Sequence, residues 1–199
     1  MNVLFVCTGN TCRSPMAEAL LKQRAQSDIQ VKSCGISAMP GAPASSQTEE
    51  VLRQEGIEIN HQSAPINAAL VQWADVILTM TASHKERIWS EYPEERKKTY
   101  TLKEFALHAD IKIWEQIEKA YANLEEKRKR CVKQFDSQMD PIEQRRRLYE
   151  IGQEEMETIR DLKRQLTHSD IADPFGGSTA HYLKTKQEIE SCLDHWLSS

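Results

Sequence analysis

The sequence MNVLFVCTGNTCRSPMAEAL (1–20) carries the clearest indication of the fold. Its apolar run NVLFV (2–6) is rich in β-branched and aromatic residues, which is typical of a strand buried on both faces of a parallel sheet. A polar loop runs from Cys7 to Arg13. Ser14 and Pro15 then fit the N-cap and the first position of a helix whose apolar residues recur at helical spacing. The stretch therefore predicts a strand, a loop and a helix.

The same alternation continues along the chain. The runs VKSCGI (31–36) and DVILTM (75–80) read as further strands, and helices are expected over 46–54, 67–73 and 82–91. Strands that alternate with helices predict an α/β fold, a doubly wound parallel four-stranded sheet with flanking helices. Ligands of such sheets bind at the carboxyl ends of the strands, and Cys7 lies at such an end.

The composition changes between about His108 and Leu166, where charged residues of both signs dominate and Gly152 and Pro141 are the sole glycine and proline. Apolar residues recur at three-four spacing in two segments, and Asp140 with Pro141 can begin the second of them. The positions are Trp114, Ile117, Tyr121, Leu124, Cys131 and Phe135, then Ile142, Tyr149, Gly152, Met156, Ile159 and Leu166. We expect an inserted antiparallel helical hairpin.

The domain organisation follows from this insertion. Residues 1–107 and 168–199 would form one α/β domain, and residues 108–167 the inserted charged helical hairpin. The hairpin is either a solvated structural element or an arm that contacts a partner or a second copy. A last amphipathic helix would bury a stripe of residues, including Cys192, in the core: Tyr182, Ile189, Cys192, Leu193 and Trp196.

Charge and composition exclude several classes of protein. The net charge is −4 with both signs interspersed, which argues against a nucleic-acid or membrane surface. The first apolar run is too short for a signal peptide, so we expect a cytoplasmic protein. The five cysteines lack paired C-x2-C spacing, and the six histidines, His61, His84, His108, His168, His181 and His195, lack ligand spacing. We expect free thiols, no metal and no organic cofactor.

The loop CTGNTCR (7–13) has the composition of a phosphate site. Its five inner residues, Thr8, Gly9, Asn10, Thr11 and Cys12, lie between a strand and a helix. With Gly9 permitting a left-handed bend, their backbone N–H groups would point inward as a nest at the positive end of the helix. Arg13 can bring its planar fork to two phosphate oxygens, and the same positive field favours the nucleophilic thiolate of Cys7. The loop predicts a site that attacks phosphorus.

Such chemistry also needs an acid. The leaving group must be protonated, and the water that opens the phosphoenzyme must be deprotonated; one carboxylate can do both. The candidates are Asp173 in DPFGGS (173–178), Asp170 three residues earlier, and an acid outside this loop.

The first twenty residues together with DPFGGS resemble the low-molecular-weight protein tyrosine phosphatase family, and within it the bacterial protein-arginine phosphatases. The resemblance covers about residues 1–105 and 170–199. It implies that Cys7 is the nucleophile, Arg13 binds phosphate, Ser14 donates a hydrogen bond to the thiolate, and Asp173 is the general acid. Phosphorylated proteins would be the substrates. It also suggests a protective Cys7–Cys12 disulfide, against the alternative that Cys12 is a small buried filler.

Two details of the resemblance favour phosphoarginine over phosphotyrosine. Thr11 stands where tyrosine-directed relatives carry a larger aliphatic residue, and Phe175 is followed by two glycines rather than by further aromatic residues. A guanidinium could be held by Asp173 while Phe175 lines its plane. We expect hydrolysis of the P–N bond through a phosphocysteine intermediate, with a tyrosine phosphatase as the alternative.

Three other readings stay open from the sequence. Arsenate reductases share this loop but need a close pair of redox cysteines downstream, which Cys34, Cys131 and Cys192 do not supply. A phosphocysteine carrier of sugar transport needs neither Arg13 nor Asp173. An interaction module without catalysis would be built around the hairpin, and the intact set of Cys7, Arg13 and Asp173 argues against it.

Overall fold

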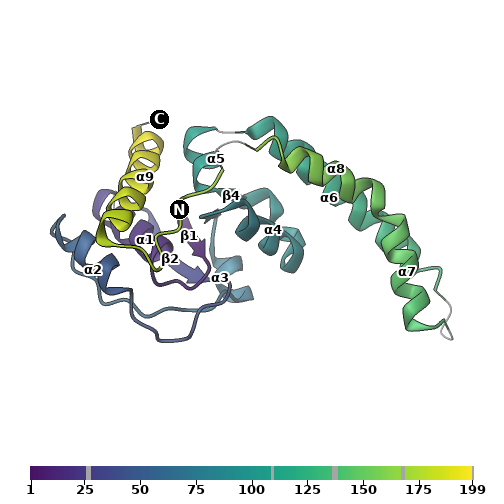
Figure 1. Ribbon diagram of the computed structural model, residues 1–199, viewed down its shortest axis with the longest axis horizontal. Helices are drawn as coiled ribbons and strands as arrows, with labels where there is room; N and C mark the ends of the chain where they lie inside the picture. Colours follow the sequence, from purple (N-terminus) through teal and green to yellow (C-terminus); the bar gives the residue numbers. More distant parts are fainter. Residues whose placement is uncertain (26–27, 109, 136–138, 167–168, 199) are drawn as a thin grey trace. The chain divides into compact units, whose positions relative to one another are not determined.

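The computed structural model describes residues 1–25, 28–108, 110–135, 139–166 and 169–198. The chain forms two compact units, Met1–Ala109 with Ser169–Ser199, and Asp110–His168. Figure 1 labels the elements of both units. None of the helices within the described ranges is long and apolar enough to cross a membrane.

The first unit is built on a four-stranded parallel sheet with the order β2-β1-β3-β4. Its strands are β1 (Asn2–Cys7), β2 (Gln30–Gly35), β3 (Val76–Thr79) and β4 (Thr99–Thr101). The sequence located the first three. The fourth has three residues and follows a highly charged segment, so no apolar run marks it. The doubly wound fold is confirmed.

Both faces of the sheet are covered by helices (Figure 1). On β1, Val3 and Phe5 pack with α1, α2, α5 and α9, whereas Leu4 and Val6 pack with α3 and α4. This alternation follows from the period of two along a strand, and it explains the continuous apolar run. The helices are α1 (Arg13–Arg24), α2 (Ser46–Arg53), α3 (Ala68–Trp73), α4 (Ala82–Glu91), α5 (Leu102–Leu107) and α9 (Thr179–Ser198), with a 3-10 turn η1 (Pro93–Lys98).

The start of α1 differs from the expectation. Ser14 was assigned as the N-cap, but α1 begins at Arg13 with Cys12 at the cap position and no side-chain cap. The Ser14 hydroxyl is instead engaged by Asn10 and Cys7. The phosphate-loop geometry has displaced the ordinary capping interaction.

The second unit is an antiparallel helical hairpin. Its first arm is α6 (Ile111–Val132), and its second arm is divided at Gly152 into α7 (Pro141–Ile151) and α8 (Gln153–Lys163). Asp140 caps α7 by accepting from the Ile142 N–H at 3.1 Å, with Pro141 at the first position, as predicted. α6 and α8 run side by side in Figure 1. A Cβ at Gly152 would meet Leu124 of α6 at 2.6 Å, so the glycine permits this close approach.

The buried register of the second arm is not the expected one. Ile142, Tyr149 and Met156 were assigned to the packed stripe, but the first two are 75% and 69% exposed, and Met156 is exposed as well. The arm packs through Gly152, Ile159 and other positions at three-four spacing, namely Glu155 and Leu162. Met156 lies one residue after a packed position, about 100° further around the helix.

Candidate active site

A cavity of about 200 Å³ opens at the carboxyl end of β1. In the order β2-β1-β3-β4 the strand order reverses at β1, since β2 lies on one side of it and β3 on the other. The carboxyl end of β1 is therefore a topological switch point, where doubly wound sheets bind ligands. The lining residues come from the loop after β1 and from the segment before α9. They are Cys7, Thr8, Gly9, Thr11, Cys12, Arg13, Asp173 and Phe175.

The left-handed residue of the loop is Asn10 rather than Gly9. Asn10 has φ 55°, while Gly9 is not among the residues with positive φ. Asparagine tolerates this region when its side chain makes local hydrogen bonds. The fully buried Asn10 donates from Nδ2 to Ser14 and to Ser33, at 2.9 and 2.8 Å, and accepts at Oδ1 from the Ala64 N–H at 2.9 Å. These bonds fix the loop's sharpest bend.

The Cys7 thiol is held by two hydrogen-bonding groups. Its Sγ lies 2.9 Å from the Ser14 hydroxyl and accepts from the Asn10 N–H at 3.3 Å. Because Ser14 Oγ accepts from Asn10, it keeps its own hydrogen for Cys7 or for the Cys34 carbonyl at 3.3 Å. These two contacts fix the position of the sulfur at the base of the loop.

The loop is also supported from β2. The carbonyls of Cys7 and Thr8 accept from the N–H groups of Ile36 and Ser37, both at 2.9 Å. A Cβ at Gly35 would meet the Thr8 carbonyl oxygen at 2.6 Å and the Asn10 nitrogen at 2.9 Å. Since both neighbours are backbone atoms of the loop, any side chain here would displace it. Gly35 is thus a positional requirement that the sequence did not reveal.

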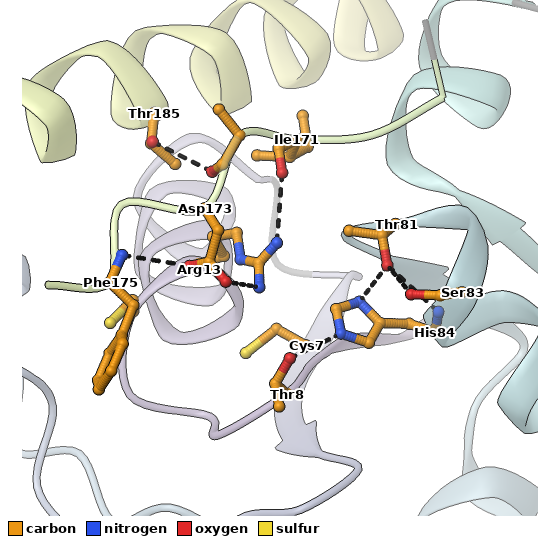
Figure 2. Close-up of polar contacts among 12 residues, drawn as sticks. Cys7, Thr8, Arg13, Thr81, Ser83, His84, Ile171, Asp173, Phe175 and Thr185 are labelled. Atoms are coloured by element: carbon orange, nitrogen blue, oxygen red, sulfur yellow. Dashed lines mark hydrogen bonds and ion pairs between the residues drawn. The ribbon is translucent and has the colours of Figure 1, made fainter. Parts of the chain in front are cut away.

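Arg13 connects the loop to the segment before α9. Its guanidinium donates from Nη2 to Asp173 Oδ2 at 2.7 Å and from Nη1 to the Ile171 carbonyl at 3.3 Å (Figure 2). Arg13 is buried while the Asp173 side chain is about half exposed. The structure therefore brings together a cysteine, an arginine and a carboxylate at one cavity.

The two candidate acids of this segment have different places. Asp173 lines the cavity, whereas Asp170 accepts from the Ala82 N–H at 2.7 Å, at the start of α4. Phe175 also lines the cavity, and its N–H donates to Asp173 Oδ1 at 3.2 Å. The Phe175 side chain is 77% exposed, and Figure 2 shows its ring pointing away from Arg13.

Thr11 and Cys12 complete the lining. The Thr11 carbonyl accepts from the N–H of Ser45 and the hydroxyl of Thr48. Cys12 Sγ lies 3.3 Å from the Tyr182 hydroxyl. Burial, and next the bond with Cys12, raise the pKa of Tyr182, so it stays a neutral phenol. Cys7 and Cys12 are both free thiols. A disulfide between them stays a prediction.

His84 of α4 is a further neighbour of the loop. Its ring lies between the hydroxyls of Thr8 and Thr81 and is 7% exposed. Burial, with the Arg13 charge, lowers the pKa of His84 to about 4, which keeps the imidazole neutral. The sequence indicated a satisfied or surface histidine here but not its contact with the loop.

Several residues of the site escaped sequence reasoning. Ser33, Gly35, His61 and Ser63 hold the loop; His61 Nε2 and the Ser63 hydroxyl both lie 2.7 Å from the Asn10 carbonyl oxygen. Ser33 and Gly35 lie in β2, His61 and Ser63 lie between α2 and α3, and none of the four belongs to a local motif. Within the described ranges no group of three or more His, Cys, Asp or Glu could hold a metal ion.

The comparisons with known proteins agree with this geometry. The family model for low molecular weight phosphotyrosine protein phosphatase matches residues 2–149. A protein-arginine-phosphatase of Bacillus subtilis (strain 168) is 43% identical over 196 residues, which cover 97% of this chain and 92% of that protein. A protein-arginine-phosphatase of Geobacillus stearothermophilus is 45% identical over 108 residues, 54% of this chain and 73% of that protein.

A solved structure shares the fold. The YwlE arginine phosphatase from Geobacillus stearothermophilus superimposes with a TM-score of 0.65 and 32% identity, over 98% of this chain and 88% of that one. The matched part includes the strand, loop and helix that carry Cys7 and Arg13. This chain belongs to the low molecular weight phosphotyrosine protein phosphatase family.

Proposed function

We propose that this chain is a protein-arginine phosphatase that hydrolyses the P–N bond of phosphoarginine through a phosphocysteine intermediate on Cys7. The observation that carries the proposal is the meeting of Cys7, Arg13 and Asp173 at one cavity. Relatives named protein-arginine-phosphatase, one of them similar over nearly the whole chain, support the choice of substrate. Phosphorylated proteins are the substrate class.

The first half of the reaction transfers the phosphoryl group to sulfur. The Cys7 thiolate, held by Ser14 and the Asn10 N–H, attacks phosphorus, and the P–N bond breaks. Arg13 holds two phosphoryl oxygens, and the backbone N–H groups of Thr8, Gly9, Thr11 and Cys12 are the proposed further donors. Protonated Asp173 gives its proton to the departing nitrogen, so arginine leaves as a guanidinium and Asp173 becomes a carboxylate.

The second half releases phosphate. Asp173, now a carboxylate, removes a proton from water, whose oxygen attacks phosphorus and breaks the S–P bond. Cys7 departs as a thiolate, again stabilised by the Ser14 hydroxyl 2.9 Å away. Asp173 regains its proton, and inorganic phosphate leaves. The lining of the cavity by Cys7, Arg13 and Asp173, and the contact of Ser14 with Cys7, support these roles.

Asp173 is preferred over Asp170 as the acid because of their surroundings. Asp170 accepts from the Ala82 N–H at 2.7 Å, which holds its side chain at the start of α4 and outside the cavity lining. Asp173 has one oxygen on Arg13 and the other on the Phe175 N–H, at the mouth of the cavity. When phosphate takes the Arg13 fork, Asp173 is free to face the leaving group.

The choice of phosphoarginine rests on Thr11 and Phe175, which both line the cavity. Thr11 is a small polar residue beside the thiol of Cys12, with its Oγ1 3.5 Å from that sulfur. A planar guanidinium fits between this polar wall and Phe175, whose exposed ring is free to turn over it. Hydrolysis of phosphotyrosine is the second candidate, because the family model carries that description.

A mass-spectrometric trap tests the central step. The wild-type chain mixed with a phosphoarginine peptide and quenched within one turnover should carry one phosphoryl group on the peptide that contains Cys7. Cys7→Ser should release no phosphate above background. Cys192→Ala is the matched control, because this buried cysteine of α9 lies outside the cavity and should leave turnover intact. Turnover by Cys7→Ser, or phosphate on another residue, would contradict the assignment.

The second unit, Asp110–His168, is by the same proposal an accessory element, since none of the cavity residues lies in it. Its exposed apolar residues Ile142 and Tyr149 suit a contact with a partner or a second copy. Replacing the hairpin by a short linker should leave turnover of small substrates nearly unchanged. Ile142→Glu with Tyr149→Glu in the full chain should then abolish any self-association seen by light scattering. Loss of phosphate binding in a folded linker variant would contradict the accessory role.

A further inference from the structure

A buried histidine outside the cavity is linked by a hydrogen bond to one of its lining residues. His84 Nε2 lies 2.9 Å from Thr8 Oγ1, and His84 Nδ1 lies 2.8 Å from Thr81 Oγ1 (Figure 2). Thr8 lines the cavity and is open to solvent there, whereas His84 is buried behind it. Among the bonds described for the Thr8 hydroxyl, His84 is the partner.

The histidine ring is held rigidly on both sides. Thr81 caps α4 by accepting from the His84 N–H at 3.2 Å, and its hydroxyl also lies 2.9 Å from Ser83 Oγ. In the same turn of α4, the Ala82 N–H donates to Asp170, which lies in the same segment as Asp173. The first turn of α4 therefore joins the segment of Asp173 to the phosphate loop through fixed hydrogen bonds.

Hydrogen counting leaves two arrangements for this chain of bonds. A neutral imidazole has one donor and one acceptor nitrogen. If Ser83 donates to Thr81 and Thr81 donates to Nδ1, then Nε2 carries the hydrogen and donates to Thr8. In the reverse arrangement Nδ1 donates to Thr81, and Thr8 gives its hydrogen to Nε2. Every group has a hydrogen-bond partner in both arrangements. In the first, Thr8 can donate its hydroxyl hydrogen into the cavity; in the second, Thr8 can only accept a hydrogen bond there.

The charges around the ring favour a neutral form throughout. Burial and the charge of Arg13 in α1 both lower the pKa of His84. The charge of Asp173 raises this pKa, but its effect is smaller. A neutral ring beside Arg13 adds no second cation to the site, so its contribution must come through the direction of its hydrogen bonds. An anion in the cavity selects the arrangement that turns a hydrogen, rather than a lone pair, toward it.

We propose that His84 is a positioning residue that donates from Nε2 to the Thr8 hydroxyl, so that Thr8 donates its own hydrogen to an oxygen of the phosphoryl group in the Cys7 cavity. The inference rests on the proposed function, in that the cavity must take a phosphoryl group. It adds a side-chain donor to the backbone N–H groups of the loop. It also assigns the start of α4 a part in binding that acts through Thr8.

The tautomer is measurable without any variant. In the wild-type chain, imidazole 15N and 1H shifts at neutral pH should show His84 as the neutral Nε2–H form when the protein is saturated with inorganic phosphate. An imidazolium, or the Nδ1–H form in the phosphate complex, would overturn the proposal. The same spectra test the chain as it exists, so they do not depend on how a substitution folds.

Binding of inorganic phosphate to four variants provides the second test. His84→Leu and Thr8→Val each remove the proposed donor path and should raise the Kd for phosphate about 10-fold, the usual size for a hydrogen bond to a charged group. His84→Gln places an amide N–H near the position of Nε2 and should recover most of that loss. In the double variant His84→Leu, Thr8→Val the losses should not add, because both act through one bond.

Ser83→Ala is the matched control. It removes the hydroxyl 2.9 Å from Thr81 without touching the Thr8–His84 bond, so phosphate binding should be unchanged. Equal Kd values for His84→Leu and the wild type, additive losses in the double variant, or no recovery with Gln in a folded protein would each overturn the proposal. These outcomes are distinct from failure of the proposed function, which would appear as a wild-type chain that binds phosphate but does not hydrolyse phosphoarginine.

Discussion

The guanidinium of Arg13 lies 2.7 Å from the carboxylate of Asp173, across 160 residues of sequence. The proposed phosphate-binding group and the proposed general acid therefore neutralise each other before substrate arrives. A phosphoryl dianion is the stronger partner for the Arg13 fork, so its binding should release Asp173 toward the leaving group. This coupling connects substrate binding to the arrival of the acid.

Replacing Asp173 by Asn should slow turnover in a manner that depends on the leaving group. The amide keeps the size of the side chain but cannot donate an acidic proton, so we expect kcat to fall by about 100-fold on a substrate with a poor leaving group. An activated aryl phosphate needs less protonation, and its kcat should fall much less. Steady-state kinetics on the two substrates check this.

The matched comparison for that experiment is Asp170→Asn. Asp170 accepts a backbone hydrogen bond at the start of α4, so its loss should lower stability without separating the two substrates. If Asp173→Asn lowered kcat equally on both substrates, Asp173 would not be the acid. The same conclusion would follow if Asp170→Asn showed the dependence on the leaving group instead.

The sequence predicted the parts of the fold that have strong local signals. The run NVLFV became β1, buried on both faces, and Asp140 with Pro141 begins α7. It did not predict β4, which has three residues, or the exposed side of the second hairpin arm, where heptad-spaced Ile142 and Tyr149 resemble a packed stripe. Periodicity identifies an apolar stripe, but only the partner helix decides which stripe is buried.

At the site, the sequence predicted the residues of the loop after β1 and of the DPFGGS motif. It did not predict the residues that hold this loop from other parts of the chain. The left-handed bend was assigned to Gly9, but Asn10 adopts it, because contacts with Ser33 and Ala64 offset the strain. Ser33 lies in β2, and Ala64 lies in the connection between α2 and α3. No local pattern marks them.

Stability should depend on pH through His84. Burial first, then Arg13, lowers the pKa of His84 from 6.5 to about 4, and Asp173 acts in the opposite direction. As pH falls from neutral, the unfolded chain takes up this proton near 6.5 while the folded chain does not. The free energy of unfolding should therefore fall by about 3 kcal/mol between pH 7.5 and 4 from this group.

Urea unfolding of the wild type and His84→Gln at several pH values isolates that contribution. Gln does not titrate, so the difference in unfolding free energy between the two proteins should shrink or reverse as the pH falls through this range. A difference that stays constant with pH would show that His84 titrates normally in the folded protein.

Oxidation should be reversible only while Cys12 is present. A thiolate at Cys7 is readily oxidised, and a nearby thiol can trap the sulfenic acid as a disulfide. Peroxide-treated wild type should regain activity with dithiothreitol, whereas Cys12→Ser should progress to forms that dithiothreitol does not reduce. Burial raises the pKa of Cys192 to about 11, so Cys192→Ala should behave as the wild type. Equal recovery of Cys12→Ser would contradict the protective role.

The most direct test of the account is a comparison of kcat/KM for phosphoarginine and phosphotyrosine peptides in the wild type and in Thr11→Ile. Isoleucine adds bulk and removes a hydroxyl from the cavity wall, which should disfavour a guanidinium relative to a phenyl ring. A change of this size in a pocket alters discrimination by about 10- to 200-fold. Thr11→Ser keeps the hydroxyl and should keep the preference. We expect a wild-type preference for phosphoarginine that Thr11→Ile weakens or reverses; a wild-type preference for phosphotyrosine, or a ratio that Thr11→Ile leaves unchanged, would contradict phosphoarginine as the substrate.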